Sequence, residues 1–142
     1  MRAGWAVVVA VLFMLLYAPI SAADEPSVSL QDMIDRARAG DTVVIPAGTY
    51  EGPVLIDKPI DLRPAQNGAV TLKHSGDSPA VTIRADRVRF SGFTIVYETE
   101  GEAAAVLVES NGTALDELHI LTASHGIMVR GGSDGEIRNS II

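Results

Sequence analysis

The side chains best suited to metal chemistry in this 142-residue chain are three histidines and two methionines, namely His74, His119, His125, Met33 and Met128. Imidazole and thioether groups hold transition metals when several of them converge. His119 lies between two apolar residues of an alternating pattern, so it is expected to point outward, and His125 precedes a glycine at an expected corner. We therefore predict surface histidines and ordinary packing, with no metal site among these residues.

Glycoside hydrolysis is the second chemistry to consider, because Ser124-His125-Gly126-Ile127 resembles the His-Gly pair of polygalacturonase-type hydrolases. That reaction also requires two carboxylates at a defined separation. Asp116 and Glu117 are adjacent, and consecutive side chains on a strand point to opposite faces. Such enzymes also carry an Arg-Ile-Lys motif, which Glu136-Ile137-Arg138 resembles only weakly. The sequence thus predicts no catalytic residues and no hydrolase.

A calcium-dependent lyase would need acidic ligands gathered on one outer face and a basic residue for proton abstraction. The acidic residues here alternate with basic ones, which is typical of a solvated surface. The residues concerned are Asp57, Lys58, Asp61, Arg63, Arg84, Asp86 and Arg87. Asn111-Gly112-Thr113 matches a glycosylation acceptor, but a turn between two strands is the simpler interpretation. Asn139 is expected to begin an asparagine stack at a corner.

Two interleaved strand patterns must position these side chains. Residues 90–95, 115–120 and 137–142 alternate between apolar and polar and recur after 25 and then 22 residues; residues 81–83, 106–108 and 127–129 recur after 25 and then 21. Alternation with period two indicates strands buried on one face, and a repeat of this length indicates a solenoid. Parallel crossovers are right-handed. The prediction is an all-β, right-handed parallel β-helix of about three coils.

A short amphipathic helix is expected to cap the first coil. Ser29 is a good N-cap residue, with Asp32 as its capping-box partner, and Gly40 is a good terminator. An apolar stripe is formed by Leu30, Met33, Ile34 and Ala37. Terminal repeats of solenoids need such caps. The last strand, 137–142, has no cap of its own, which predicts a β-helix truncated at its C-terminus.

The N-terminal segment sets the expected compartment. Arg2, an apolar stretch over 6–17 and the small residues Ser21-Ala22-Ala23 are typical of a secretory signal peptide. We predict cleavage after Ala23, leaving a single β-helix domain over 24–142 in an exported, periplasmic protein. The chain has no Cys, so burial and strand pairing must hold the fold. The mature chain keeps all 18 acidic residues and 10 of 11 basic ones, a formal charge of −8 that disfavours nucleic acid.

The segments 29–34, 39–50 and 56–62 together resemble the opening of NosD-type right-handed β-helix proteins, and 85–95, 126–130 and 137–141 resemble their later coils. The resemblance implies a periplasmic accessory protein, not an enzyme, whose partners are an ABC transporter and the copper enzyme nitrous-oxide reductase, which it helps to mature. Copper is implied by the resemblance alone.

An alternative from another class is a carbohydrate-binding or carbohydrate-active β-helix, lyase-like or hydrolase-like, that lacks its active coils. Such a protein stacks sugar rings on outward aromatic side chains. Only Tyr50 and Tyr97 are expected to point outward, because Phe90 and Phe93 occupy inward positions of the alternation. The shortage of aromatic platforms favours the accessory protein.

Overall fold

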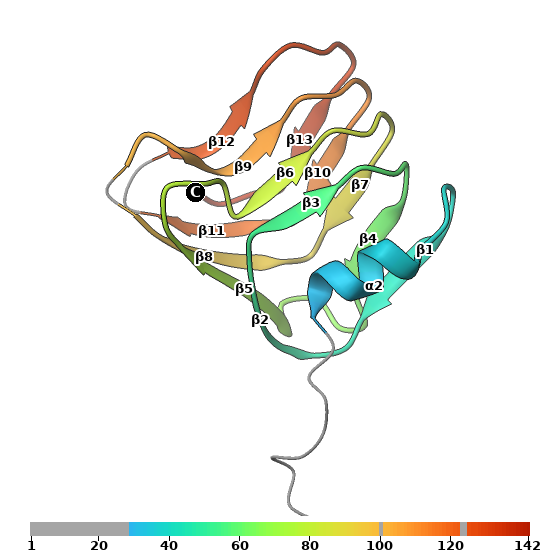
Figure 1. Cartoon of the computed structure of the whole chain (residues 1–142), viewed down its shortest axis with the longest axis horizontal. Helices are drawn as coiled ribbons and strands as arrows, with labels where there is room; N and C mark the ends of the chain where they lie inside the picture. The colour runs from blue at the N-terminus through green and yellow to red at the C-terminus, as the bar shows by residue number, and fades with distance from the viewer. Residues whose placement is uncertain (1–28, 100, 123–124) are drawn as a thin grey trace, which may run out of the picture.

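The computed structural model of the chain describes residues 29–99, 101–122 and 125–142. They form a right-handed parallel β-helix of about four turns with one short helix at one end (Figure 1), so the predicted fold class is confirmed. Three parallel sheets make up its walls. Sheet A contains β1, β4, β7, β10 and β13, sheet B contains β2, β5, β8 and β11, and sheet C contains β3, β6, β9 and β12.

The elements are short, as expected for a solenoid in which each turn visits three walls. Their bounds are α2 (Leu30–Arg36), β1 (Thr42–Ile45), β2 (Gly48–Glu51), β3 (Val54–Ile56), β4 (Asp61–Pro64), β5 (Val70–Ser75), β6 (Val81–Ile83), β7 (Arg89–Ser91), β8 (Thr94–Glu98), β9 (Ala104–Val108), β10 (Ala114–Asp116), β11 (His119–Thr122), β12 (His125–Val129) and β13 (Glu136–Arg138).

The register of the sheets is the one that the sequence repeats predict. Phe90 pairs with Leu115, and Leu115 pairs with Ile137, along sheet A. In sheet C, Val81 pairs with Val106, which pairs with Ile127. Like residues therefore stack directly above one another and form continuous apolar rows inside the solenoid, where burial supplies the main stabilisation.

The first turns explain why the sequence repeats predict only about three coils. Thr42 pairs with Asp61 and Asp61 pairs with Arg89, so successive turns advance by 19 residues (42 to 61) and then 28 (61 to 89). Later turns advance by 25 (89 to 114) and 22 (114 to 136). Because the two early lengths differ so much, no constant spacing reveals the first turn.

Helix α2 closes one end of the solenoid, as predicted, although it ends at Arg36 and not near Gly40. The Ser29 hydroxyl accepts a hydrogen bond from the Asp32 amide at 3.1 Å. Leu30 and Ile34 are completely buried against the first turn. After Arg36 the chain becomes extended at Ala37, and the last helical carbonyls are taken by a lysine from the first turn.

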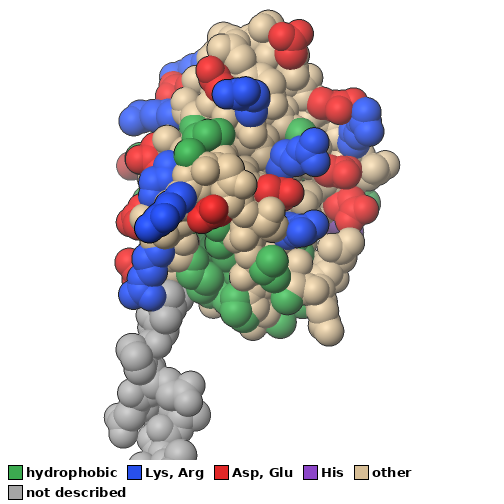
Figure 2. Space-filling model, turned by 90° about the vertical axis from the view of Figure 1, so that its right-hand side faces the viewer, with side chains coloured by type: hydrophobic (Ala, Val, Ile, Leu, Met, Phe, Trp, Pro, Cys, Tyr) green, Lys and Arg blue, Asp and Glu red, His purple; other side chains and the backbone are tan. Residues whose placement is uncertain are grey.

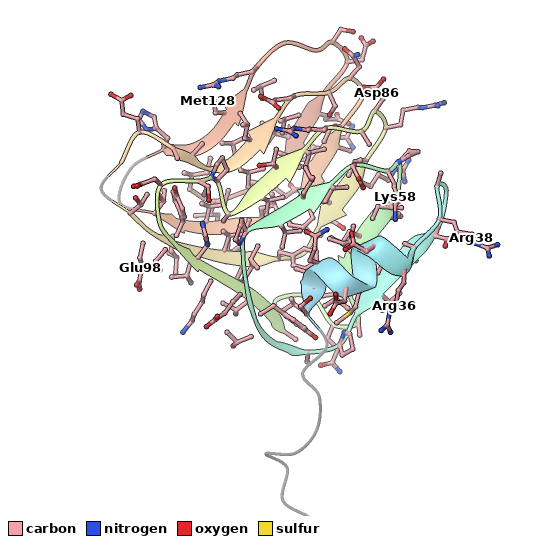
Figure 3. All side chains as sticks on the ribbon, in the orientation of Figure 1. Arg36, Arg38, Lys58, Asp86, Glu98 and Met128 are labelled. Atoms are coloured by element: carbon pink, nitrogen blue, oxygen red, sulfur yellow. The ribbon has the colours of Figure 1, made fainter. Side chains whose placement is uncertain are left out.

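That lysine is Lys58, which lies beside the end of α2 in Figure 3. Its ammonium group donates to the carbonyl oxygens of Ile34, Asp35 and Ala37 at 3.3, 2.8 and 3.0 Å. A cation at a helix C-terminus satisfies carbonyls that have no partner within the helix and lies favourably in the helix dipole. The sequence pattern placed Lys58 only at a corner.

The corner between sheets A and B uses a left-handed residue at the same place in three turns. Gly92, Glu117 and Asn139 have φ values of 76°, 50° and 47°. Asn139, expected to begin an asparagine stack, has Glu117 and Gly92 below it, and its amide donates to the Asp116 carboxylate at 3.0 Å. The residue is there because asparagine tolerates left-handed backbone better than most residues do.

The ladder of polar side chains lies instead at the corner between sheets C and A. The Asp86 carboxylate accepts from the Asn111 amide N–H at 2.8 Å, and the Asn111 side-chain oxygen accepts from the Ser133 N–H at 2.8 Å. Each side chain thus satisfies a backbone donor of the next turn. Asn111 belongs to a turn, in agreement with the simpler interpretation of its sequon.

The end opposite α2 exposes large apolar side chains. Val129, Ile137, Ile141 and Ile142 are each about half exposed or more. The expected strand over 137–142 is divided, because β13 ends at Arg138 and Ile141 then forms a single bridge with His119. The predicted signal peptide, 1–23, lies outside the described residues, among which no helix is long and apolar enough to cross a membrane.

Candidate binding faces

The histidines do not converge. His74 lies on β5, where its ring stacks on Tyr97 with centroids 5.9 Å apart, and its Nε2 lies 3.1 Å from the Ser78 hydroxyl. His119 is exposed on sheet B, as expected, and His125 is exposed at the start of sheet-C strand β12. Within the described ranges no three His, Asp or Glu side chains are grouped so that they could hold a metal ion.

The two methionines take separate roles in packing. Met33 is partly buried and packs against the core beneath α2, as the stripe predicts. Met128 is half-buried on β12, in register with Leu107 of β9 (Figure 3). Since Met33 and Met128 belong to opposite ends of the solenoid, their sulfur atoms cannot share one metal ion.

The adjacent carboxylates Asp116 and Glu117 also diverge, as predicted. Asp116 is held by the Asn139 amide, whereas Glu117 occupies the left-handed corner and accepts from the Asn67 amide at 2.7 Å. Both carboxylates are therefore engaged in turn-to-turn hydrogen bonds. Ser124, part of the hydrolase-like stretch, lies outside the described residues.

The tyrosines differ from their expected positions. Tyr97 is buried, with 1 % of its surface exposed, and its hydroxyl lies 3.2 Å from the Gly76 carbonyl and 3.0 Å from the Ser78 carbonyl. It sits two residues after buried Ile95 on β8, so strand alternation turns it inward. The prediction that Tyr97 is an outward platform was wrong.

Tyr50 is also less exposed than the sequence pattern predicts. It pairs in register with buried Leu72 and packs partly against the core, and its hydroxyl donates to the Pro46 carbonyl at 2.7 Å. Burial raises the pKa of the Tyr50 phenol above its ordinary value. The phenol is therefore a structural group that joins β2 to the turn before it.

The outer face of sheet A carries the densest set of charged side chains. Figure 2, which looks onto this side of the solenoid, shows acidic and basic side chains interleaved. Two parallel rows run across the strands. One contains Asp61, Arg89, Ala114 and Glu136, and the other contains Arg63, Ser91, Asp116 and Arg138.

A shallow depression of about 330 Å³ lies over this face, because small Ser91 and Ala114 stand among longer side chains. Arg138 and Glu136 form an ion pair at its edge. In contrast, Arg63 and Arg89 form no ion pair or side-chain hydrogen bond with another described residue. Two exposed guanidinium groups thus remain available for carboxylates or carbonyls of a partner.

Sequence reasoning treated Arg63 as part of an ordinary solvated pattern and did not consider Arg89. The signal that brings them together is the register of β4 with β7, in which Asp61 pairs with Arg89. That pairing depends on the 28-residue second turn, which the regular repeat does not predict. Asp57 and Asp86, which were considered as calcium ligands with Asp61, lie off this face, and Asp86 holds the corner ladder.

The fold defines the class of protein to which the chain belongs, that of the right-handed parallel β-helices. No family model, curated protein or solved structure matches the chain.

Proposed function

We propose that this chain is an exported accessory protein of the NosD type, which acts as a docking partner and not as an enzyme. On this proposal it works in the periplasm with an ABC transporter in maturing the copper site of nitrous-oxide reductase. The resemblance of segments 29–34, 39–50 and 56–62 to NosD-type proteins supports membership of that family, and the β-helix fold is consistent with such membership. The docking role is supported by one observation, the open and charged outer face of sheet A.

The charged groups of this face are suited to binding another protein. Three arginines and three carboxylates surround the depression, so its formal charge is balanced and it favours a partner that presents both signs. Arg63 and Arg89 supply planar groups that bind carboxylates in a bidentate manner. No polyanion is expected here, because Asp61, Asp116 and Glu136 would repel it.

On this proposal, copper is bound by the partner enzyme and not by this chain. The described residues offer no cluster of three His, Asp or Glu, and their histidines lie on separate elements. Because soft or borderline ions need converging ligands, the chain by itself is expected to bind no stoichiometric Cu(I). Dialysis of the purified chain against Cu(I), followed by metal analysis, measures this directly.

The docking proposal is tested by co-expression of the tagged full chain with the ABC transporter subunits and the reductase of the same genome. The complex should co-purify, and a double variant Arg63→Ala/Arg89→Ala should bind at least about tenfold more weakly, about 1.4 kcal/mol. Biolayer interferometry with the purified partners gives the dissociation constants.

The matched control is Arg36→Ala/Arg38→Ala, which removes two arginines at the end of α2 and just after it (Figure 3), neither of which lines the sheet-A depression. It changes the net charge equally and should leave binding within about twofold. Absence of any complex with these partners, or equal weakening by both double variants, would contradict the docking proposal.

A further inference from the structure

A second hollow lies on the outer side of sheet B, on a different wall from the docking face. Its volume is about 400 Å³, within the range of small-molecule sites. It crosses three strands where these turn toward sheet C. Its principal side chains are Glu51, Lys73, His74, Ser75, Val96 and Glu98. We call this hollow the sheet-B groove.

The polar groups of the groove are free to bind a ligand. In residues 29–99, 101–122 and 125–142, the side chains of Glu51, Lys73 and Glu98 have no ion-pair or hydrogen-bond partner. Glu51 and Lys73 are directly opposed on neighbouring strands, and Glu98 projects from the outer side of β8 (Figure 3). The groove thus presents acceptors and donors together, over half-buried Val96.

The position of His74 is fixed before any ligand arrives. Its ring is stacked on buried Tyr97, its register partner, at an interplanar angle of 12°, and its Nε2 lies 3.1 Å from the Ser78 hydroxyl. On the other side, Gly52 leaves room for it, since a Cβ there would lie 3.3 Å from the His74 Cβ. His74 is therefore a positioning residue, which fixes the end of β5 and so holds exposed Lys73 and Ser75 in place at low ordering cost on binding.

A row of hydroxyls extends the groove along the solenoid axis. Thr49 pairs with Thr71, Thr71 pairs with Thr94, and all three lie on the outer face, two residues before the groove residues of their strands. Strands of a sheet are separated by about 4.8 Å. The hydroxyls therefore repeat at a spacing close to the length of one hexose unit in an extended glycan.

We propose that the sheet-B groove binds a neutral oligosaccharide that lies along the solenoid axis, across the strands. Sugar hydroxyls donate to the Glu51 and Glu98 carboxylates and accept from the Lys73 ammonium, while a C–H face of the ring packs on Val96. Two carboxylates against one lysine disfavour a uronate or a sulfated sugar, so neutral chains are selected.

This inference goes beyond the docking function and does not depend on it, because the two surfaces lie on different sheets. It also differs from a catalytic role. Lys73, the partner of Glu51, pairs with Val96, so Glu98 lies two strands and two residues away from Glu51. Their backbone positions are therefore about 12 Å apart, beyond the carboxylate separations that hydrolysis uses. The groove is expected to bind and not to cleave.

The test is isothermal titration of the full chain with neutral hexasaccharides, namely maltohexaose, cellohexaose, xylohexaose and chitohexaose, and with hexagalacturonate as the anionic comparator. At least one neutral hexamer should bind, and the comparator should bind at least tenfold more weakly. The double variant Glu51→Ala/Glu98→Ala should lose at least tenfold in affinity, and His74→Ala at least threefold.

Arg89→Ala on sheet A is the matched control, and its affinity for the sugar should be unchanged. Circular dichroism of each variant reports folding, and both glutamates are exposed, so their replacement should leave the β-helix intact. The inference is overturned if no neutral hexamer binds, if hexagalacturonate binds as well or better, or if the folded glutamate double variant retains wild-type affinity. Each of these results leaves the docking experiment on sheet A unaffected.

Discussion

Two corners of the same solenoid are built in opposite ways. From the third turn on, the corner from sheet A to sheet B takes two residues each time, 92–93, 117–118 and 139–140, and begins with a left-handed residue. The corner from sheet B to sheet C takes two residues in the first turn, 52–53, and then five at 76–80 and at 99–103. The corner from sheet A to sheet B has two residues in the first turn, 46–47, and five in the second, 65–69, and is constant from the third turn on. We call it the constant corner, and the corner from sheet B to sheet C the variable corner.

The difference in corner length assigns the two corners different roles, one in keeping the strands in register and one beside the proposed ligand site. A constant corner keeps the inward rows of successive turns aligned, and the same left-handed backbone conformation recurs there. A corner of changing length cannot serve that purpose, but it begins where β2, β5 and β8 end, beside Glu51, Ser75 and Glu98 of the sheet-B groove. In this molecule, the irregular corner adjoins the proposed ligand site, while the regular corner preserves the core.

The largest expected effect comes from Phe93→Ala, at the second residue of the constant corner. Phe93 is 1 % exposed and stacks on Phe90 with ring centroids 4.5 Å apart. Removal of a buried phenyl ring from a core costs about 3–5 kcal/mol. Urea denaturation followed by circular dichroism should show this loss. A loss below about 1 kcal/mol would mean that the constant corner does not anchor the core.

Gly92→Ala should destabilise the constant corner by about 1–3 kcal/mol. Gly92 has a φ of 76°, and an added Cβ would lie 2.8 Å from the Cδ and Cγ atoms of Pro64 in the turn below. The strained backbone and the rigid proline ring both oppose the methyl group. Thermal unfolding is the measurement, with exposed Gly68→Ala as a control whose left-handed backbone is also strained but whose Cβ meets nothing.

At the variable corner, Tyr97→Phe should cost about 0.5–1.5 kcal/mol. The lost hydroxyl lies within hydrogen-bond distance of the Gly76 and Ser78 carbonyls, which belong to the 76–80 loop. Because this loop also positions His74, sugar affinity should fall in the same variant. Chemical denaturation and calorimetric titration on one sample test both. An unchanged sugar affinity would separate the loop from the groove.

The smallest effect, with the opposite sign, is expected for Glu117→Gly. Glu117 occupies the place of Gly92 one turn later, with a φ of 50°, so glycine relieves strain there and should stabilise the chain by about 0.5–1 kcal/mol. Asn67→Ala removes the hydrogen bond to Glu117 without altering the backbone, and so measures the part of the change that comes from that bond. Destabilisation by Glu117→Gly beyond that of Asn67→Ala would refute the strain argument.

Strand parity and repeat length were enough to predict the fold. The alignment of Phe90, Leu115 and Ile137 is the one that the 25- and 22-residue repeats predict. The first turn was missed because its length is not repeated. Tyr97 was misplaced because the alternation was not extended past Ile95; counting by two from inward Phe93 turns Tyr97 inward as well.

The candidate sites were much less predictable. A surface site depends on which outward residues become neighbours across strands, and that depends on loop lengths that carry no apolar pattern. Arg63 and Arg89 are 26 positions apart in the chain and meet only through the long second turn. His74 is oriented by Tyr97 and Ser78, contacts that arise from the 76–80 loop.

The lysine that crosses from the first turn to the helix has a consequence for the order of assembly. A helix of seven residues is too short to persist by itself. The Ile34 carbonyl accepts from the Ala37 N–H at the cap, but the Asp35 and Ala37 carbonyls accept from Lys58, which lies more than twenty residues later in the chain. The first turn must therefore close before α2 is stable. The cap of this solenoid is formed by the body that it covers, so folding should start within the coils and finish at the helix.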